Sequence, residues 1–275
     1  MTRQLRITRA NAQYQQWRAL LDNRTKRQRA GEFLVQGVRP ITLAVQHGWP
    51  VRALIHDAGR SPSRWAQDLM ARAGGARVAM VPELLRELGG KDAEVPEVVA
   101  VVELPEDDLG RIRVGPHFLG AVFDRPGSPG NIGTMLRSLD AFGGAGLVTT
   151  GHASDPYDPR AVRASTGSLF AVPVVRARSH REVLDWVARV REGQVPLQVL
   201  GTDEDGAVEI TDADLTGPTL MVIGNETSGL SAGWQEACDV TVRIPMAGSA
   251  SSLNAASAAT VVLYEAARQR RTQTR

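Results

Sequence analysis

Short apolar runs alternate with stretches of helical periodicity in the first part of the chain. A basic, polar helix is expected near Ala12–Arg29. The strands expected in this part are Glu32–Gly37, Val51–His56, Ala76–Val81 and Val98–Leu104. Strands that alternate with helices indicate an α/β layer.

From about residue 117 the alternation resumes with longer apolar runs. The expected strands are Phe118–Phe123, Gly146–Thr150, Ala171–Val175, Leu197–Gly201, Thr219–Ile223 and Val240–Ile244. The expected helices are Asn131–Phe142, Arg181–Arg191 and Asn254–Arg270. Continuous apolar strands are typical of a mostly parallel sheet, which binds ligands at the carboxyl ends of its strands.

An acidic, turn-forming stretch lies between the two parts. It begins Pro105-Glu106-Asp107-Asp108 and favours a linker at residues 106–116, although an ordinary surface loop is the alternative. We therefore expect an N-terminal domain at 1–105 and a second domain at 117–275.

Composition narrows the class of protein only moderately. The 275 residues are 43% hydrophobic and 23% charged, which is ordinary for a globular protein. The net charge of +2 is too small to identify a nucleic-acid partner. A single cysteine, Cys238, excludes an internal disulfide framework and a cysteine-based zinc site, and we expect no metal.

No apolar run approaches the roughly 20 residues of a membrane span, and Met1–Leu5 lacks the apolar stretch of a signal peptide. We expect a cytoplasmic protein.

A Pro- and Gly-rich loop follows the expected strand that ends at Phe123. Asn131 is placed to cap the next helix, where free backbone N–H groups favour an anion. Arg137 falls on roughly the opposite side from the apolar face of this helix, free to meet a ligand. The alternative is a capped helix with a solvated arginine.

Two further loops follow the expected strands Thr219–Ile223 and Val240–Ile244. In Gly224–Leu230, Gly224 allows the backbone to approach a ligand closely, and Glu226 could accept hydrogen bonds. The second loop runs from Pro245 to Asn254 and enters a helix of small residues. A tight turn and simple helix caps remain the alternatives for these loops.

Together, the three loops resemble motifs one, two and three of the TrmH-type SPOUT RNA methyltransferases. The resemblance covers residues from about 118 to the end, and Arg24–Arg29 with Phe33–Gly37 is similar to the ribosomal-protein-like RNA-binding domain often fused to these enzymes. It implies a SPOUT domain with a deep trefoil knot, S-adenosylmethionine as methyl donor, and a homodimer with the active site near the subunit interface.

The resemblance also implies site residues by position. Arg137 matches the proposed catalytic arginine, grouped with Asn131, Glu226, Ser252 and Asn254. The residues expected to bind the donor are Thr202, Gly224, Asn225, Glu226, Gly229, Ile244, Met246, Ser252 and Leu253. Departures from the common pattern are Ser251 in place of an acidic residue and Ala255-Ala256 after Asn254.

The implied reaction is methyl transfer to a ribose 2′-hydroxyl of RNA. The two-domain layout resembles the ribosomal RNA methylases that protect producers of antibiotics such as avilamycin, so we expect a uridine in large-subunit (23S) ribosomal RNA. Transfer RNA as substrate and a non-catalytic RNA-binding protein are the alternatives. The side chains expected to contact RNA are Arg18, Arg24, Lys26, Arg27, Arg29 and Arg163, although a solvated helix face would explain the N-terminal group equally simply.

Other enzyme classes fit less well. The cluster Gly143-Gly144-Ala145-Gly146 lies between a helix and a strand, not after the first strand as a dinucleotide site requires. No Walker-type phosphate loop is present, and no histidine is visibly paired with Ser228 or Ser252 as a serine hydrolase would need.

Overall fold

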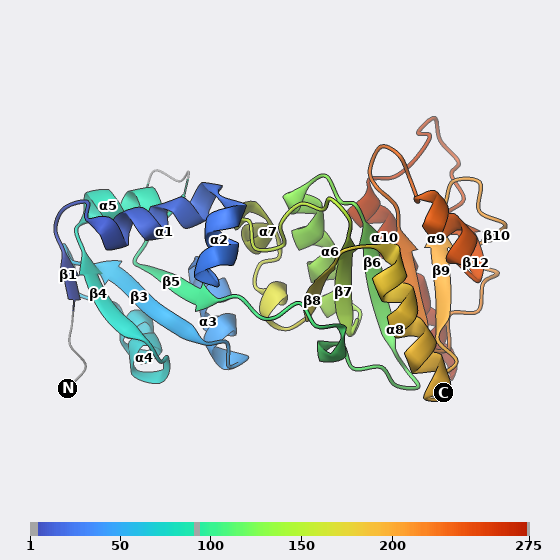
Figure 1. Cartoon of the computed structure of the whole chain (residues 1–275), viewed down its shortest axis with the longest axis horizontal. Helices are drawn as coiled ribbons and strands as arrows, with labels where there is room; N and C mark the ends of the chain where they lie inside the picture. Colours follow the sequence, from blue (N-terminus) through green and yellow to red (C-terminus); the bar gives the residue numbers. More distant parts are fainter. Residues whose placement is uncertain (1–4, 91–93, 274–275) are drawn as a thin grey trace. The chain divides into compact units, whose positions relative to one another are not determined.

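The computed structural model describes residues 5–90 and 94–273, and the chain divides into two compact units (Figure 1). The first unit combines Met1–Pro105 with Tyr157–Ala171. The second combines Glu106–Pro156 with Val172–Arg275.

The first unit is built on a mixed sheet of five strands in the order β1-β4-β3-β5-β2. The strands are β1 (Leu5–Ile7), β2 (Glu32–Gln36), β3 (Val51–Asp57), β4 (Ala76–Met80) and β5 (Val98–Glu103). β1, β4 and β3 are parallel, while β5 pairs antiparallel with both β3 and β2. The helices of residues 5–90 are α1 (Ala12–Asp22), α2 (Arg24–Ala30), α3 (Val38–Gln46), α4 (Arg64–Arg72) and α5 (Pro82–Leu88).

The basic stretch expected as one helix near Ala12–Arg29 forms two helices, α1 and α2. Asn23 separates them: its backbone N–H donates to Ala19 O at 3.1 Å and ends α1. Its side-chain oxygen accepts from the Lys26 N–H at 3.0 Å and caps α2. Asparagine favours helix caps because its short side chain satisfies these free backbone groups.

The segment Tyr157–Ala171 packs within the first unit, although it lies between strands of the second unit in sequence. It contains α7 (Pro159–Ala164) and the short 3₁₀ turn Ser168–Phe170. The ring of Phe33 on β2 lies 5.0 Å from that of Tyr157 and 6.3 Å from that of Phe170. The expected strand at Ala171–Val175 accordingly begins later, as β8 (Val174–Ala177).

The second unit is built on a seven-strand sheet in the order β10-β12-β9-β11-β6-β7-β8, with every pair of neighbours parallel. Its other strands are β6 (Leu119–Asp124), β7 (Gly146–Thr150), β9 (Gln198–Thr202), β10 (Val208–Glu209), β11 (Thr219–Ile223) and β12 (Val240–Arg243). Every residue of β6, β7 and β11 is buried, as expected for central parallel strands covered on both faces.

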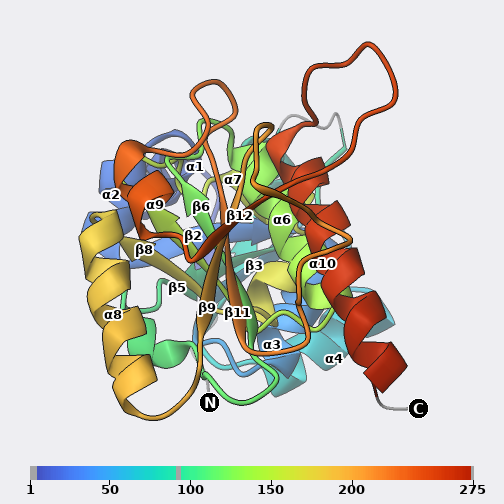
Figure 2. The same cartoon turned by 90° about the vertical axis from the view of Figure 1, so that its right-hand side faces the viewer.

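Helices cover both faces of this sheet (Figure 2). On one face lie α8 (His180–Glu192) and α9 (Ala232–Ala237), whose Trp186 and Trp234 join a buried apolar core. On the other face α6 (Pro129–Ala141) packs along α10 (Ala255–Gln273), and Ser138 hydrogen-bonds Thr260 at 2.7 Å. This packing holds α10 against the helix that follows β6.

The stretch 106–116, expected as a linker, packs onto the second unit. Leu109 and Ile112 are 7% and 4% exposed and belong to the same core as Trp186. Asp107 also accepts hydrogen bonds from the backbone and guanidinium of Arg176 on β8.

Candidate functional site

Three loops meet at the carboxyl ends of β6, β11 and β12. They are residues 125–128 with the first turn of α6, the loop 224–230, and the loop 244–254 that leads into α10. Parallel strands bring their carboxyl ends to one edge of the sheet, which is why loops about 100 residues apart in sequence can share a site.

Glu226 holds the first loop to the second. Its carboxylate accepts hydrogen bonds from the Gly127 N–H at 2.9 Å, the Ser128 N–H at 3.2 Å and Asn131 Nδ2 at 2.9 Å. Burial alone would raise the pKa of this carboxyl, but the hydrogen bonds outweigh that effect and hold the pKa below its usual value. Glu226 is therefore a fixed anion at neutral pH.

Asn131 and Asn254 connect the third loop to the same network. Asn254 Nδ2 donates to Asn131 Oδ1 at 3.2 Å, while Asn131 donates to Glu226. The side-chain oxygen of Asn254 also caps α10 by accepting from the Ala256 N–H at 3.0 Å. The sequence expectation that Asn131, Glu226 and Asn254 are neighbours agrees with this geometry.

The loop 224–230 has a closed shape that depends on its glycines. Asn225 and Gly229 exchange two backbone hydrogen bonds of 2.9 and 3.0 Å. A Cβ on Gly224 would lie 2.4 Å from the carbonyl carbon of Gly229, so no other residue fits without a backbone shift. Gly229 itself has a φ of +63°, in the left-handed region that glycine adopts readily.

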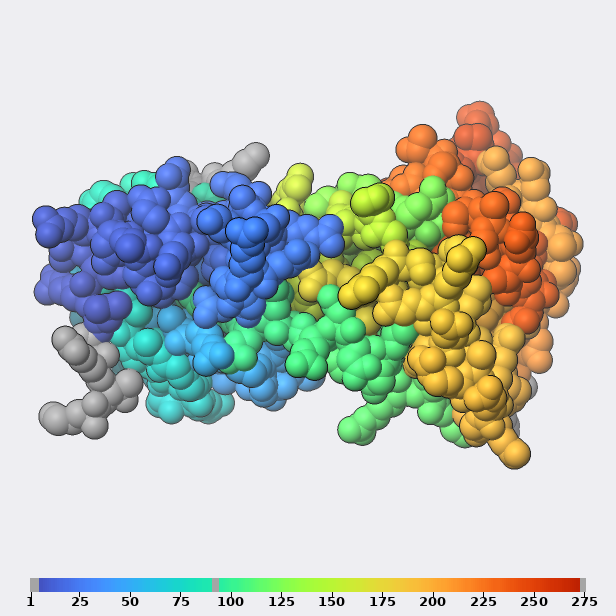
Figure 3. Space-filling model, viewed as in Figure 1, coloured from blue at the N-terminus to red at the C-terminus, as the bar shows by residue number. Residues whose placement is uncertain are grey.

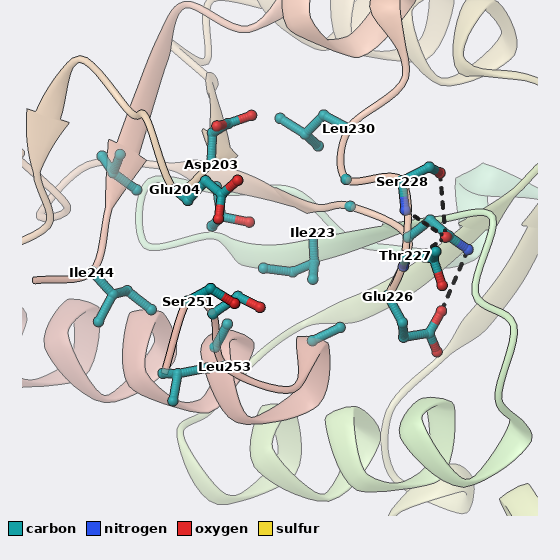
Figure 4. A pocket seen from close by; sticks show the side chains of 18 of the residues that line it. Asp203, Glu204, Ile223, Glu226, Thr227, Ser228, Leu230, Ile244, Ser251 and Leu253 are labelled. Carbon is teal, nitrogen blue, oxygen red and sulfur yellow. Dashed lines mark hydrogen bonds between the residues drawn. The ribbon is translucent and has the colours of Figure 1, made fainter. Parts of the chain in front are cut away.

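A pocket of about 600 Å³ opens between the loops 224–230 and 244–254 and the residues that end and follow β9 (Figure 4). Apolar side chains of Ile223, Leu230, Val242, Ile244 and Leu253 form part of its wall. The residues expected from sequence to bind a donor all line it: Thr202, Gly224, Asn225, Glu226, Gly229, Ile244, Met246, Ser252 and Leu253. Their role as ligands stays a prediction, but the structure brings them to one cavity.

The pocket also has lining residues that the sequence analysis missed. Asp203 and Glu204 lie across the pocket from Glu226 and Thr227 (Figure 4). Gln235, Thr227 and Ser228 contribute further polar groups. Two acidic residues after a strand look like an ordinary surface turn, and only their position directly after Thr202 could have indicated the site.

Arg137 and Ser252 occupy different surroundings, although the resemblance grouped them. Ser252 lines the pocket and is exposed. Arg137 is exposed on α6 and is not among the described residues that line the pocket of its own chain. Its predicted catalytic role therefore has no contact in a single chain to support it.

The side chains expected to contact RNA are exposed, with one exception. Arg18, Arg24, Lys26, Arg29 and Arg163 are all exposed in the first unit, where α1 and α2, in blue, cover much of the visible face (Figure 3). The prediction that Arg27 contacts RNA is wrong, because only 2% of its surface is exposed. Its Nη1 donates to Leu20 O at 2.7 Å and to Leu21 O at 3.3 Å, so it satisfies the end of α1 and does not face solvent.

Other kinds of site find no support in the residues described. Across 5–90 and 94–273, no group of three or more His, Cys, Asp and Glu side chains is arranged to hold a metal ion. Within the same ranges, no helix combines the length and apolar character needed to cross a bilayer. Burial raises the pKa of the Cys238 thiol to about 12, so it remains protonated at neutral pH and is a poor nucleophile.

Comparison with known proteins identifies the class. The model of the SpoU rRNA Methylase family matches residues 119–264, and that of the SpoU L30e-like domain matches residues 11–100. The chain belongs to the SpoU rRNA methylase family and is a methyltransferase. The comparisons confirm a SPOUT fold for the second unit and a ribosomal-protein-like fold for the first. The deep trefoil knot is the feature that the resemblance attached to the SPOUT fold.

Individual relatives match over nearly the whole chain. The 23S rRNA (uridine(2479)-2′-O)-methyltransferase of Streptomyces viridochromogenes is 60% identical over 96% of this chain and 92% of its own length. The crystal structure of the SpoU methyltransferase AviRb from that organism, in complex with the cofactor AdoMet, matches with a TM-score of 0.92 and 60% identity, covering 96% of this chain and 99% of that one. An AdoMet-bound rRNA methyltransferase from Sinorhizobium meliloti matches with a TM-score of 0.85 and 28% identity, covering 96% and 98%.

Proposed function

We propose that this chain transfers a methyl group from S-adenosylmethionine to the ribose 2′-hydroxyl of a uridine in 23S ribosomal RNA. The observation that carries the proposal is the pocket between the loops 224–230 and 244–254, which the hydrogen bonds of Glu226, Asn131 and Asn254 link to each other. The 23S rRNA (uridine-2′-O)-methyltransferase activity of the 60% identical relative supports the choice of nucleotide and RNA.

The pocket fits a nucleoside-sized donor. Its volume of about 600 Å³ lies within the range of small-molecule sites. The apolar wall formed by Ile223, Ile244 and Leu253 suits a flat base, and the bare backbone at Gly224 permits close approach by hydrogen-bonding ligand groups. When bound, the donor supplies a methyl carbon that is electrophilic because its sulfur is positively charged. Transfer to the ribose oxygen breaks the sulfur–methyl bond, leaves a neutral thioether, and releases the hydroxyl proton to water.

The protein's contribution is then to place the ribose hydroxyl and to stabilise charge on its oxygen. A guanidinium stays protonated at any physiological pH, so Arg137 is a poor general base. We assign to Arg137 the orientation of an RNA phosphate and stabilisation of the developing 2′-alkoxide. Glu226, Asn131 and Asn254 hold the loops so that the attacking oxygen and the methyl group can align.

We further propose that the active unit is a homodimer. Val261 and Tyr264 on α10, and Leu253 and Met246 in the loop before it, are large apolar side chains that are 36–51% exposed. A second copy of the chain that covered them would remove this apolar surface from water. Because Arg137 does not line the pocket of its own chain, we propose that it serves the pocket of the partner subunit.

A mixed dimer tests this sharing of sites. One subunit would carry Arg137→Ala and the other Gly224→Val, whose side chain would collide with Gly229. If sites are shared between subunits, one pocket of the mixed dimer has both an intact wall and an arginine, and activity is restored to about half of the wild-type value. If each chain uses its own Arg137, both pockets of the mixed dimer are defective and activity stays absent.

We propose that the first unit binds RNA, through the exposed side chains of Arg18, Arg24, Lys26, Arg29 and Arg163. Guanidinium and ammonium groups neutralise phosphates without reading sequence. We place the protein in the cytoplasm, where its RNA substrate resides, and propose protection from avilamycin as the physiological role.

Tritiated methyl donor tests the proposed reaction. Wild-type protein and Arg137→Ala would be given separate pools of ribosomal and transfer RNA. We expect label in large-subunit ribosomal RNA that is lost with the mutation. Label in transfer RNA alone would replace the proposed substrate, and donor binding without transfer to naked RNA or to ribosomal particles would favour a non-catalytic RNA-binding protein.

A further inference from the structure

Arg125 has an unusual backbone conformation directly after β6. Its φ is +51°, a value that a residue with a side chain adopts only at a cost in free energy. Its N–H donates to Thr150 O at 3.1 Å, which fixes the residue at the carboxyl end of β7. Such a conformation persists when the surrounding contacts hold it. Two of the contacts of Arg125 are with residues that line the pocket.

Arg125 contacts both ends of the closed loop 225–229. Its carbonyl oxygen accepts a hydrogen bond from Asn225 Nδ2 at 2.7 Å. Its guanidinium Nη2 donates to Gly229 O at 3.1 Å. Asn225 and Gly229 are the two residues whose backbones pair to close the loop, and both line the pocket.

Asp124 supports the same arrangement from inside the protein. Its side chain is 4% exposed, and its Oδ2 accepts from Arg125 Nε at 3.1 Å and from the Ser231 N–H at 3.0 Å. Its Oδ1 accepts from Thr150 Oγ1 at 2.9 Å. One buried carboxylate thus orients the guanidinium of Arg125 and fixes the residue that follows the loop.

We propose that Asp124 and Arg125 are positioning residues that clamp the loop 224–230 in the shape that binds the methyl donor. This inference rests on the proposed function, because it concerns the same pocket. Neither side chain is among the residues that line the pocket, so both act through Asn225, Gly229 and Ser231.

Calorimetric titration of S-adenosylmethionine into the protein without RNA tests the clamp. Arg125→Asn is the informative variant, because asparagine tolerates a positive φ but cannot reach Gly229. We expect it to weaken donor binding about tenfold, as for the loss of one charge-assisted hydrogen bond. Arg125→Lys keeps a positive hydrogen-bond donor without the fork geometry, and its affinity for the methyl donor should lie between those of wild type and Arg125→Asn. Asp124→Asn should weaken binding at least as much as Arg125→Asn.

Kinetics distinguish positioning of the donor loop from other roles. In Arg125→Asn we expect the KM for the donor to rise about tenfold, in line with binding, while the KM for RNA and kcat stay within about twofold of wild type. Arg181→Asn, at an exposed arginine on α8 away from the pocket, is the matched control and should behave as wild type.

Two results would overturn the clamp. One is donor binding by Arg125→Asn equal to that of wild type. The other is a rise in the KM for RNA with an unchanged KM for the donor, which would make Arg125 an RNA contact. A wild-type protein that binds no S-adenosylmethionine would instead overturn the proposed function, and the clamp with it.

Discussion

The helices α2 and α6 each carry an arginine to which the sequence assigned a role in binding or catalysis, but the two side chains have opposite surroundings. On α2, Arg27 is buried and donates to the last carbonyls of α1. On α6, Arg137 lies between the buried Leu136 and Ser138 and is itself exposed. An arginine in a motif can therefore complete the fold or remain available to a substrate, and only its packing distinguishes the two.

The largest effect should come from Arg137. We expect Arg137→Ala to lower kcat by about 100- to 1000-fold, as when a group that stabilises developing charge is removed. Its thermal stability and its affinity for S-adenosylmethionine should stay at wild-type values. Arg137→Lys should recover only a small part of the activity, because an ammonium lacks the planar fork of donors. Near-normal turnover of the lysine variant would rule out the bidentate role.

Arg27 should give the second largest effect, and on stability. In Arg27→Ala, the buried carbonyl of Leu20 and the partly buried carbonyl of Leu21 lose their donor, and we expect the free energy of unfolding to fall by about 2–3 kcal/mol. Arg29→Ala, two residues along and exposed, is the control and should change it by less than about 0.5 kcal/mol. Urea unfolding measures both, and equal values would remove the distinction between buried and exposed arginine on α2.

For RNA binding, we expect the exposed side chains of α2 to matter, in contrast to their small effect on stability. Lys26→Ala and Arg29→Ala should each weaken RNA binding and reduce the slope of log K against log salt by roughly one. Titrations at several salt concentrations measure this slope. If both variants keep the wild-type slope, the exposed face of α2 is only a solvated surface.

The smallest effect concerns Glu226 and pH. Its pKa is lower in the folded protein than the usual 4.5, so its contribution to stability is complete above that value and is lost as the pH falls through the lowered pKa. Melting temperatures of wild type and Glu226→Gln, compared from about pH 7 to about pH 3, should differ most at neutral pH and converge at the acidic end. A constant difference over this range would contradict the assignment of Glu226 as the anion that holds the first loop.

The sequence predicted the central strands because their apolar runs are continuous. Leu119–Asp124 and Thr219–Ile223 are buried along their whole length, so the signal needs no knowledge of their neighbours. The packing of Tyr157–Ala171 on Phe33 could not be predicted in this way. It depends on contacts between residues more than 100 positions apart, and the local pattern contains no trace of them.

In the candidate site, too, some residues could be predicted from the sequence and others could not. The resemblance of the loops to the family motifs was enough to predict Gly224, Ile244 and Leu253 as neighbours. The structure brings them to one pocket because parallel strands have their carboxyl ends at one edge of the sheet. Asp203 and Glu204 were missed because acidic residues after a strand are common in solvated turns. The burial of Arg27 was missed because the direction of one side chain on a seven-residue helix depends on the helix packed against it.

The most direct test of the central claim is mass spectrometry of nucleosides from 23S ribosomal RNA. The RNA would come from cells that lack this protein, and from the same cells expressing wild type or Arg137→Ala. We expect one additional 2′-O-methyluridine per 23S molecule with wild type and none with the variant. An unchanged content of 2′-O-methyluridine in 23S RNA, with wild-type protein present and bound to its donor, would contradict the proposed activity.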